Sequence, residues 1–177
     1  YQINLFNEIT ARIINKNPGI SYRHIANSSA ILKYPKSHFN MVRPGIALYG
    51  ALPYADAKSN LKPVMAFKAP VTLIRKMSKG SSIGYNRKYK LDTDRMIATV
   101  QAGYADGVNT ALCNIGQVSF GSKLLNIVGK ISMDQMAVDV TGVKINPGDL
   151  VTIWGGDNRE TRVEKVASGI DKIPYEL

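Results

Sequence analysis

The sequence has very little cysteine and histidine, and this scarcity excludes several kinds of site. Cys113 is the single cysteine in 177 residues, so no disulfide forms within the chain, which fits a reducing, cytoplasmic compartment. The two histidines, His24 and His38, lack the spacing of metal ligands, so we expect no metal site. A P-loop and the G-x-G-x-x-G fingerprint are also absent.

Long hydrophobic runs are missing as well. No apolar stretch approaches the roughly 20 residues that span a bilayer, so we expect no membrane segment. The first residues show no basic start followed by an apolar centre, so we expect no signal peptide. The chain does not begin with Met, which indicates a processed or trimmed piece.

Acidic residues are few: 13 Asp and Glu stand against 23 Lys and Arg, for a formal charge of +10. Three interpretations stay open: a solvated basic surface, a nucleic-acid surface, and a site for an anionic cofactor, substrate or acidic partner. The basic residues are scattered and do not alternate with stacking aromatics. We therefore expect no nucleic-acid partner, and a non-catalytic basic β-barrel binding module is an alternative function.

The apolar pattern divides the chain into two parts. Residues 1–50 have an α/β order, with a helix over 1–17, a strand over 20–25, a brief helix over 30–32 and a strand at 41–42. A polar linker over 51–62 separates them from residues 63–177, where short apolar runs alternate with turn residues and predict a small barrel or sandwich. The predicted strands are 64–76, 82–85, 96–102, 117–120, 124–128, 137–140 and 150–154. Thr161 and Glu164 form a capping-box pattern for a late helix that Gly169 would close.

Two tyrosines, Tyr85 and Tyr104, each follow a glycine at the ends of the stretch 82–107. Glycine lets a backbone turn or approach another surface closely, so a Gly-Tyr pair at a strand end can push a phenol into a cleft. The alternative is that both are half-buried barrel aromatics with solvated hydroxyls.

Three further groups of residues are candidates for ligand binding or catalysis. Ser28 follows a predicted strand at a helix start, where it either cradles an anion or, like Asn27, caps the helix. Arg43 is followed by Gly45 and Ile46, whose N–H groups can hold a phosphate, although Arg43 can equally be a surface residue. Met133 and Asp134 lie between apolar strands, which alone says little.

Taken in order, these motifs resemble the alanine racemases, which depend on pyridoxal 5'-phosphate (PLP). The matching segments are HIANSSA (24–30), NMVRPGIALYG (40–50), IGYNRKY (83–89), AGYADG (102–107), VGKISMDQMAVDVT (128–141) and IPYEL (173–177). The resemblance implies a fold type III enzyme, of which this chain covers roughly the second half. It implies an α/β barrel remnant, the last βα units of a PLP-binding TIM-like barrel, over 1–50. After the linker, a mostly-β, barrel-like C-terminal domain follows over 63–177.

The resemblance also implies roles for single residues. Tyr85 is similar to the catalytic base on the L-alanine side, and Arg43 to the arginine that faces the pyridine nitrogen. Met133 resembles the residue whose main-chain N–H holds the substrate carboxylate, with Asp134 beside it. Ser28, Gly45, Ile46 and Tyr175 match the phosphate cup, and Tyr104 with Tyr175 matches the pair of hydroxyls at the entrance.

The resemblance implies interconversion of L- and D-alanine by two bases, supplying D-alanine for peptidoglycan, in a head-to-tail homodimer. Tyr85, Tyr104, Met133 and Asp134 would then serve the partner's site. No lysine here matches the family's Schiff-base lysine, so we expect the isolated chain to be inactive. Ser132, Lys130 and Asn86 depart from common family residues, which leaves a serine/alanine racemase as an alternative.

Overall fold

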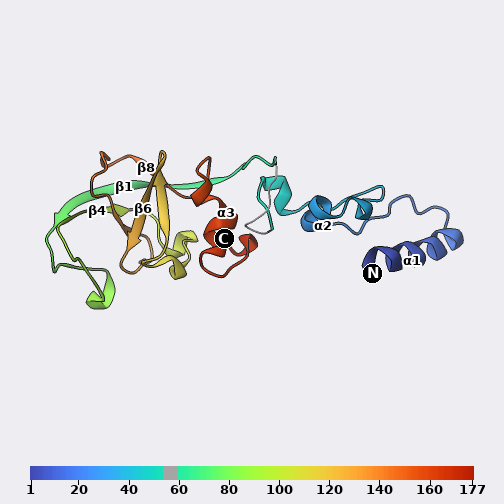
Figure 1. Ribbon diagram of the computed structural model, residues 1–177, viewed down its shortest axis with the longest axis horizontal. Helices are drawn as coiled ribbons and strands as arrows, with labels where there is room; N and C mark the ends of the chain where they lie inside the picture. The colour runs from blue at the N-terminus through green and yellow to red at the C-terminus, as the bar shows by residue number, and fades with distance from the viewer. Residues whose placement is uncertain (54–59) are drawn as a thin grey trace.

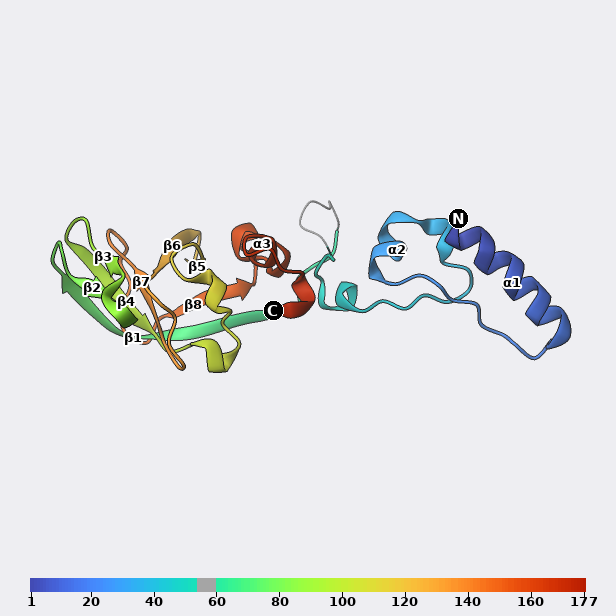
Figure 2. The ribbon, with the colours of Figure 1, turned by 90° about the horizontal axis from the view of Figure 1, so that it is seen from below.

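The computed structural model describes residues 1–53 and 60–177, and it consists of a helical N-terminal part and a closed β barrel. Figures 1 and 2 show helices α1 and α2 at one end of an elongated chain and the barrel at the other, with α3 and the C-terminus between them. Within the described ranges, no helix combines the length and apolar character that crossing a bilayer requires. The linker expected over 51–62 falls largely on residues 54–59, which lie outside the described residues.

The N-terminal part contains two α-helices and two short 3-10 helices. The predicted first helix is confirmed as α1 (Gln2–Lys16), which buries none of its residues completely and packs Phe6 against Phe39 at 5.1 Å between ring centroids. The Asn27 side chain accepts from the Ala30 N–H and so begins the second helix. The remaining elements are α2 (Ser28–Lys33), η1 (Pro35–Ser37) and η2 (Ile46–Tyr49).

The strands predicted at 20–25 and 41–42 are wrong, because both segments are extended without a β ladder. They still lie side by side. The Arg43 N–H donates to the Ala26 carbonyl at 2.9 Å, and the Asn40 side-chain amide bridges the main chains of Ser21 and Arg23. An apolar run becomes a strand only where neighbouring strands satisfy its backbone, and the described residues supply no such sheet here.

The barrel closes in the order β1-β4-β7-β6-β5-β8, with every pair antiparallel. Each strand predicted over 63–177 is found within two residues at each end, whereas the short β3 was not predicted. The strands are β1 (Ala66–Met77), β2 (Ser82–Ile83), β3 (Tyr89–Lys90), β4 (Arg95–Val100), β5 (Gln117–Phe120), β6 (Lys123–Val128), β7 (Met136–Asp139) and β8 (Leu150–Gly155). Strands β2 and β3 form a separate two-stranded hairpin.

Strand β1 closes the ring because it pairs with two different partners along its length. Its first half pairs with β8 up to Pro70, and its second half pairs with β4 from Val71 onward. Pro70 has no N–H to donate, so it fits the point at which the ladder changes sides. Bulges at Phe67/Lys68 and Val71/Leu73 bend the strand around the barrel.

The barrel core consists mainly of β-branched side chains that point inward at every second position. Fully buried members come from all six barrel strands: Val71, Val100, Val118, Ile127, Val138, Val151 and Ile153. Removing such a side chain from a packed core costs about 2–5 kcal/mol. The core therefore makes the barrel a rigid support for the loops at its ends.

The late helix is shorter than its sequence pattern indicates, because the predicted capping box does not form. Helix α3 (Val163–Ser168) has Arg162 at its N-cap, with no side-chain cap. Thr161 is fully buried instead, and its hydroxyl donates to the Gly155 carbonyl at 3.1 Å. The expected closing residue, Gly169, is confirmed. The short helices of the barrel half are η3 (Tyr85–Arg87), η4 (Tyr104–Asp106), η5 (Thr110–Leu112), η6 (Arg159–Thr161) and η7 (Pro174–Glu176).

Candidate active site

Tyr85 and Tyr104 line one pocket at the rim of the barrel, with a volume of about 500 Å³. Tyr85 is 67% exposed and so is not a half-buried barrel aromatic, whereas Tyr104, at 51%, fits that alternative. We call this cavity the rim pocket. It is lined by Ile83, Tyr85, Lys88, Tyr89, Tyr104, Thr110, Cys113, Asn114, Gly129, Lys130 and Ile131.

The glycines before the two tyrosines allow close packing at the rim. A Cβ atom on Gly84, at φ +73°, would lie 2.8 Å from the Lys130 nitrogen. A Cβ atom on Gly103 would lie 2.4 Å from the Met133 carbonyl oxygen. Only glycine fits at such contacts, and so the loops carrying both phenols pack directly against residues 129–133.

Met133 and Asp134 lie on the loop that contacts Tyr104. The Tyr104 N–H donates to the Ser132 carbonyl at 3.0 Å, and the Ala105 N–H donates to the Met133 carbonyl at 2.9 Å. Met133 is 60% exposed, and its own N–H finds no acceptor among the described residues. The structure therefore brings this free amide and the Tyr104 turn together, with exposed Asp134 beside them.

Two positioning residues at the rim pocket were missed by sequence reasoning. The Gly129 N–H donates to Asn114 Oδ1 at 2.6 Å, and the Ile131 N–H donates to Cys113 Sγ at 3.2 Å. Both bonds hold the loop against which the Gly84–Tyr85 turn packs. The only signal in the sequence is an asparagine in a turn, since Asn114 adopts a left-handed conformation at φ +65°.

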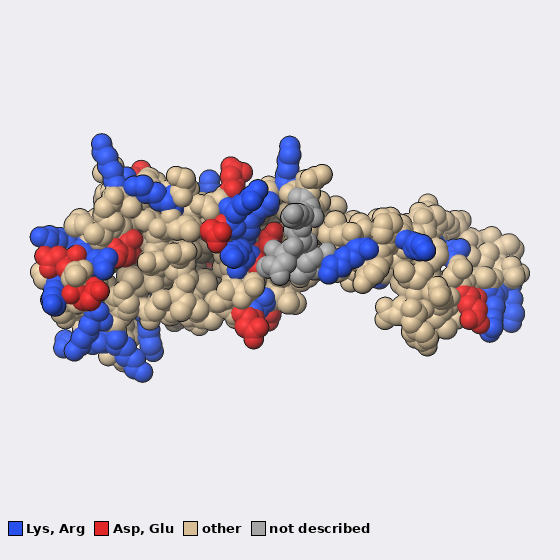
Figure 3. Space-filling view, in the orientation of Figure 1, with Lys and Arg blue, Asp and Glu red and all other residues tan. Residues whose placement is uncertain are grey.

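The rim pocket is electropositive. Lys88 and Lys130 line it, and no carboxylate does. Figure 3 shows lysine and arginine side chains gathered at the end of the molecule that carries the β2–β3 hairpin. The rim pocket therefore suits the binding of a carboxylate.

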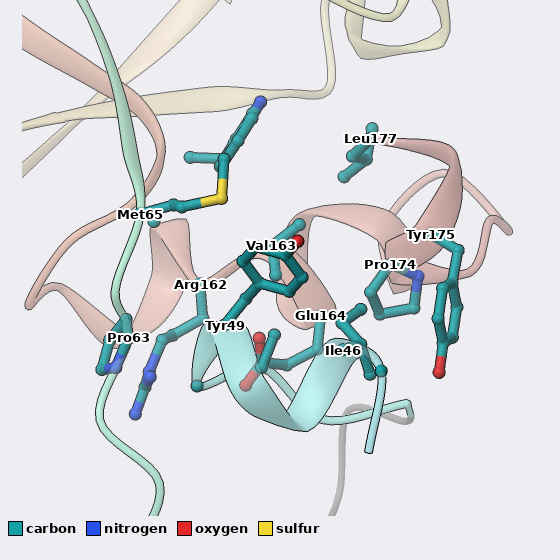
Figure 4. Close-up of a pocket in the computed structure, with 15 residues that line it drawn as sticks. Ile46, Tyr49, Pro63, Met65, Arg162, Val163, Glu164, Pro174, Tyr175 and Leu177 are labelled. Carbon is teal, nitrogen blue, oxygen red and sulfur yellow. The ribbon is translucent and has the colours of Figure 1, made fainter. Parts of the chain in front are cut away.

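A second pocket, of about 520 Å³, lies where η2 meets α3 and η7, and we call it the junction pocket. Gly45, Ile46 and Tyr175 all line it, so the structure brings together three of the residues expected to hold the cofactor phosphate. Figure 4 shows Ile46 and Tyr175 at the same end of the pocket. The Tyr175 side chain is 57% exposed.

Ser28 joins this group through its hydroxyl. Its Oγ accepts hydrogen bonds from the N–H groups of Gly45 at 2.8 Å and Ala47 at 3.3 Å. The expectation of ordinary helix capping is confirmed for Asn27, whereas Ser28 does not cap α2. The Ile46 N–H has no acceptor among the described residues, and the Ser28 hydroxyl keeps its own proton to donate.

These donors fit a phosphate group. A hydroxyl, a main-chain N–H and a phenol are the kinds of group that bind phosphate oxygens. Because the Gly45 N–H already donates to Ser28 Oγ, Ile46 has the main-chain N–H that is left to bind a ligand oxygen. Here the structure refines the sequence expectation, in which both N–H groups were candidates.

Arg43 does not line either pocket, and its side chain is exposed. Its main chain ties it to Ala26, beside the start of α2. The described residues also contain no cluster of three or more His, Cys, Asp or Glu side chains that could hold a metal ion.

The rim pocket and the junction pocket have no lining residue in common. Figure 2 shows β2 and β3 at the end of the barrel remote from α3 and the C-terminus. The residues expected to act on substrate and those expected to hold the cofactor therefore lie on different parts of one chain.

Comparisons with known proteins agree with the motifs. The family described as "Alanine racemase, C-terminal domain" matches residues 64–177, and "Alanine racemase, N-terminal domain" matches residues 1–53. The alanine racemase of Vesicomyosocius okutanii is 41% identical over 155 residues, which are 88% of this chain and 44% of that protein. That of Clostridium novyi is 39% identical over 183 residues, covering all of this chain and 47% of that protein.

Solved structures show the same relationship. The alanine racemase of Streptomyces lavendulae superposes with a TM-score of 0.88 at 32% identity, over 99% of this chain and 47% of that one. The enzyme of Bartonella henselae, solved with covalently bound pyridoxal phosphate, gives 0.82 at 34% identity, over 99% and 47%.

The predicted fold class, an α/β remnant followed by a β-barrel domain, is therefore confirmed. The chain spans about half the length of the relatives that it matches. With a family match over residues 64–177 and a second over 1–53, this chain belongs to the alanine racemase family.

Proposed function

We propose that this chain is the second half of a PLP-dependent alanine racemase that interconverts L- and D-alanine. The observation that carries the proposal is the convergence of Tyr85, Tyr104 and Met133 at one rim, although they are far apart in the sequence. A basic binding module would have no reason to bring a phenol, a free amide and close-packed glycines together. The family assignment supports the same reading.

We propose the following roles for the rim residues. Tyr85 removes or returns the α-proton on the L-alanine side, in the pocket that Lys88 and Lys130 also line. The free N–H of Met133 holds the substrate carboxylate, with Asp134 next to it. Tyr104 narrows the entrance, together with Tyr175.

Ser28, Ile46 and Tyr175 would bind the phosphate, with Gly45 holding the Ser28 hydroxyl in place, and Arg43 would face the pyridine nitrogen. When bound, the cofactor draws electron density from the amino acid and so makes its α-proton more acidic. A guanidinium stays protonated and does not transfer its proton to the ring, so Arg43 would moderate this effect. That moderation favours return of the proton over transamination.

The separation of the two pockets supports a head-to-tail homodimer. The rim of one copy would complete the site whose cup belongs to the other copy, because neither pocket alone contains both sets of residues. We further propose the division into a barrel part (1–50), a linker (51–62) and a C-terminal domain (63–177). A cytoplasmic location and the supply of D-alanine to peptidoglycan complete the proposal.

The isolated chain should be inactive, because no lysine matches the Schiff-base position. The test is to mix the chain with a purified N-terminal half from the family and PLP, and to follow D-alanine formed from L-alanine. The Tyr85→Phe variant should form D-alanine about 100-fold more slowly or worse. No activity from two folded halves, or full activity of Tyr85→Phe, would contradict the proposal. Repeating the assay with L-serine separates an alanine from a serine/alanine racemase.

A further inference from the structure

The junction pocket contains a buried carboxylate that its neighbours do not satisfy. Glu164, on α3, is 7% exposed, and its Oε2 atom is buried without a hydrogen-bond partner. Burying an ionisable oxygen without a donor is costly, so such a group usually meets a ligand or an ordered partner. Glu164 is not among the residues expected for the cofactor or the substrate.

Arg162 brings the opposite charge to the same pocket. Its guanidinium forms no ion pair or hydrogen bond with any described residue. Figure 4 shows both side chains leaving the beginning of α3, Arg162 toward Pro63 and Glu164 toward η2. Two unpaired, opposite charges therefore lie in one cavity.

The rest of the cavity is largely apolar. Ile46, Met65, Val163 and Leu177 contribute to its lining. Its volume of about 520 Å³ exceeds what an alanine molecule needs and falls within the ~300–1,000 Å³ typical of small-molecule sites. A ligand that fits has two opposite charges near one another and an apolar group several carbons long.

We propose that the junction pocket binds a free α-amino acid with a bulky apolar side chain. The ammonium group donates to Glu164, and the carboxylate accepts from Arg162, whose planar guanidinium suits two parallel hydrogen bonds. The apolar side chain lies against Met65 and Val163. This site goes beyond the proposed racemisation, since neither Glu164 nor Arg162 is among the residues expected to hold the cofactor or the substrate.

The amino-acid site and the phosphate cup occupy different ends of the cavity. Figure 4 shows Ile46 and Tyr175 on one side, Pro63 and Arg162 on the other, and Glu164 between them. The inference can therefore be tested on this chain alone, without PLP. Its failure would leave the racemase proposal untouched, and failure of the racemase assay would leave this inference untouched.

Trp154 is the single tryptophan and lines the junction pocket, so its emission reports occupancy. We would titrate the purified chain with L-leucine, and separately with 3-methylbutylamine and 4-methylpentanoate, which each lack one of leucine's two charged groups. L-leucine should shift the emission with saturation. Each single-charge analogue should bind at least about tenfold more weakly, because it leaves Glu164 or Arg162 without a partner.

Two variants test which side chain binds the ammonium group of leucine and which binds its carboxylate. Glu164→Gln should weaken leucine binding at least about tenfold and leave 4-methylpentanoate unchanged, whereas Arg162→Gln should weaken leucine and leave 3-methylbutylamine unchanged. Glu160→Gln is the matched control, because Glu160 lies just before α3 with a half-exposed side chain, paired with Lys165. It should change none of these affinities.

Three results would overturn the proposal. They are the absence of saturable leucine binding by the unmodified chain, equal affinity for leucine and both analogues, and unchanged leucine affinity in Glu164→Gln. The ligand series uses the unmodified chain, so the first two results do not depend on whether any variant folds. Filling of the cavity by water alone would appear as the first result.

Discussion

The Cα of Gly84 lies so close to the main chain of Lys130 that a Cβ atom there would be 2.8 Å from the Lys130 nitrogen. This contact places the turn that carries Tyr85 directly on the loop that leads to Met133. The spacing between the candidate base and the candidate carboxylate-binding amide is thus set by backbone packing.

Gly84→Ala should destabilise the barrel more than Gly80→Ala does. Both glycines have positive φ, +73° and +85°, and an alanine in this region costs about 1–2 kcal/mol. Gly80 faces open space, whereas Gly84 meets the Lys130 backbone, which adds about 1–3 kcal/mol. Urea unfolding followed by Trp154 emission measures both free energies. Equal losses would show that the close contact contributes nothing.

Asn114→Ala should destabilise the rim loop by about 1–3 kcal/mol, because it leaves the buried Gly129 N–H without an acceptor. Amide hydrogen exchange at Gly129 should speed up accordingly. Asn114→Asp keeps an acceptor oxygen and is the matched control, and it should preserve most of the protection. If both variants exchange like the unmodified chain, Asn114 does not hold this loop.

Acid should loosen the turn that carries Tyr175. A hydrogen bond from the Ile173 N–H, at 3.0 Å, and then one from Lys172 hold the pKa of Glu176 below its ordinary value of 4.5. A lowered folded-state pKa gives stability that is present above the unfolded-state value and lost as pH falls through the folded-state value. The turn should therefore persist at neutral pH and open only below about pH 4.5.

The amide nitrogen and proton shifts of Ile173, followed by NMR against pH, measure this titration. Their midpoint should lie below 4.5, and Glu176→Gln should abolish the transition while leaving the rest of the spectrum intact. A midpoint at or above 4.5 would mean that the hydrogen bonds from Ile173 and Lys172 do not lower the pKa of Glu176.

Much of the barrel could be predicted from the sequence, because local signals and long-range packing agree there. Buried positions such as Val138 and Val151 alternate with less buried ones, and turn residues separate the runs. The N-terminal strands could not be predicted correctly, because segments 20–25 and 41–42 need neighbouring strands to form a ladder. The capping box failed because Thr161 uses its hydroxyl inside the barrel end.

Only part of the candidate site could be predicted from the sequence. Tyr85, Tyr104 and Met133 were singled out by motifs, but their convergence depends on how the loops pack against one another. Asn114 and Cys113 have no recognisable pattern, since their role is to accept hydrogen bonds from a loop 15 or more residues away. The unpaired charges of Arg162 and Glu164 emerge only once α3 is placed against η2.

The central claim is that one copy's rim completes the other copy's cup, and a mixing experiment tests it most directly. The variants Tyr85→Phe and Arg43→Leu are each combined with a purified N-terminal half and PLP, and D-alanine formation is measured separately and after the two are mixed. When the two variants pair at random, about half of the dimers contain one copy of each. One of the two sites in such a dimer combines an intact rim with an intact cup, so about a quarter of all sites are complete. The account predicts that activity returns toward about a quarter of the unmodified level, while a Tyr85→Phe/Arg43→Leu double variant stays inactive. A mixture no more active than its two separate components would contradict it.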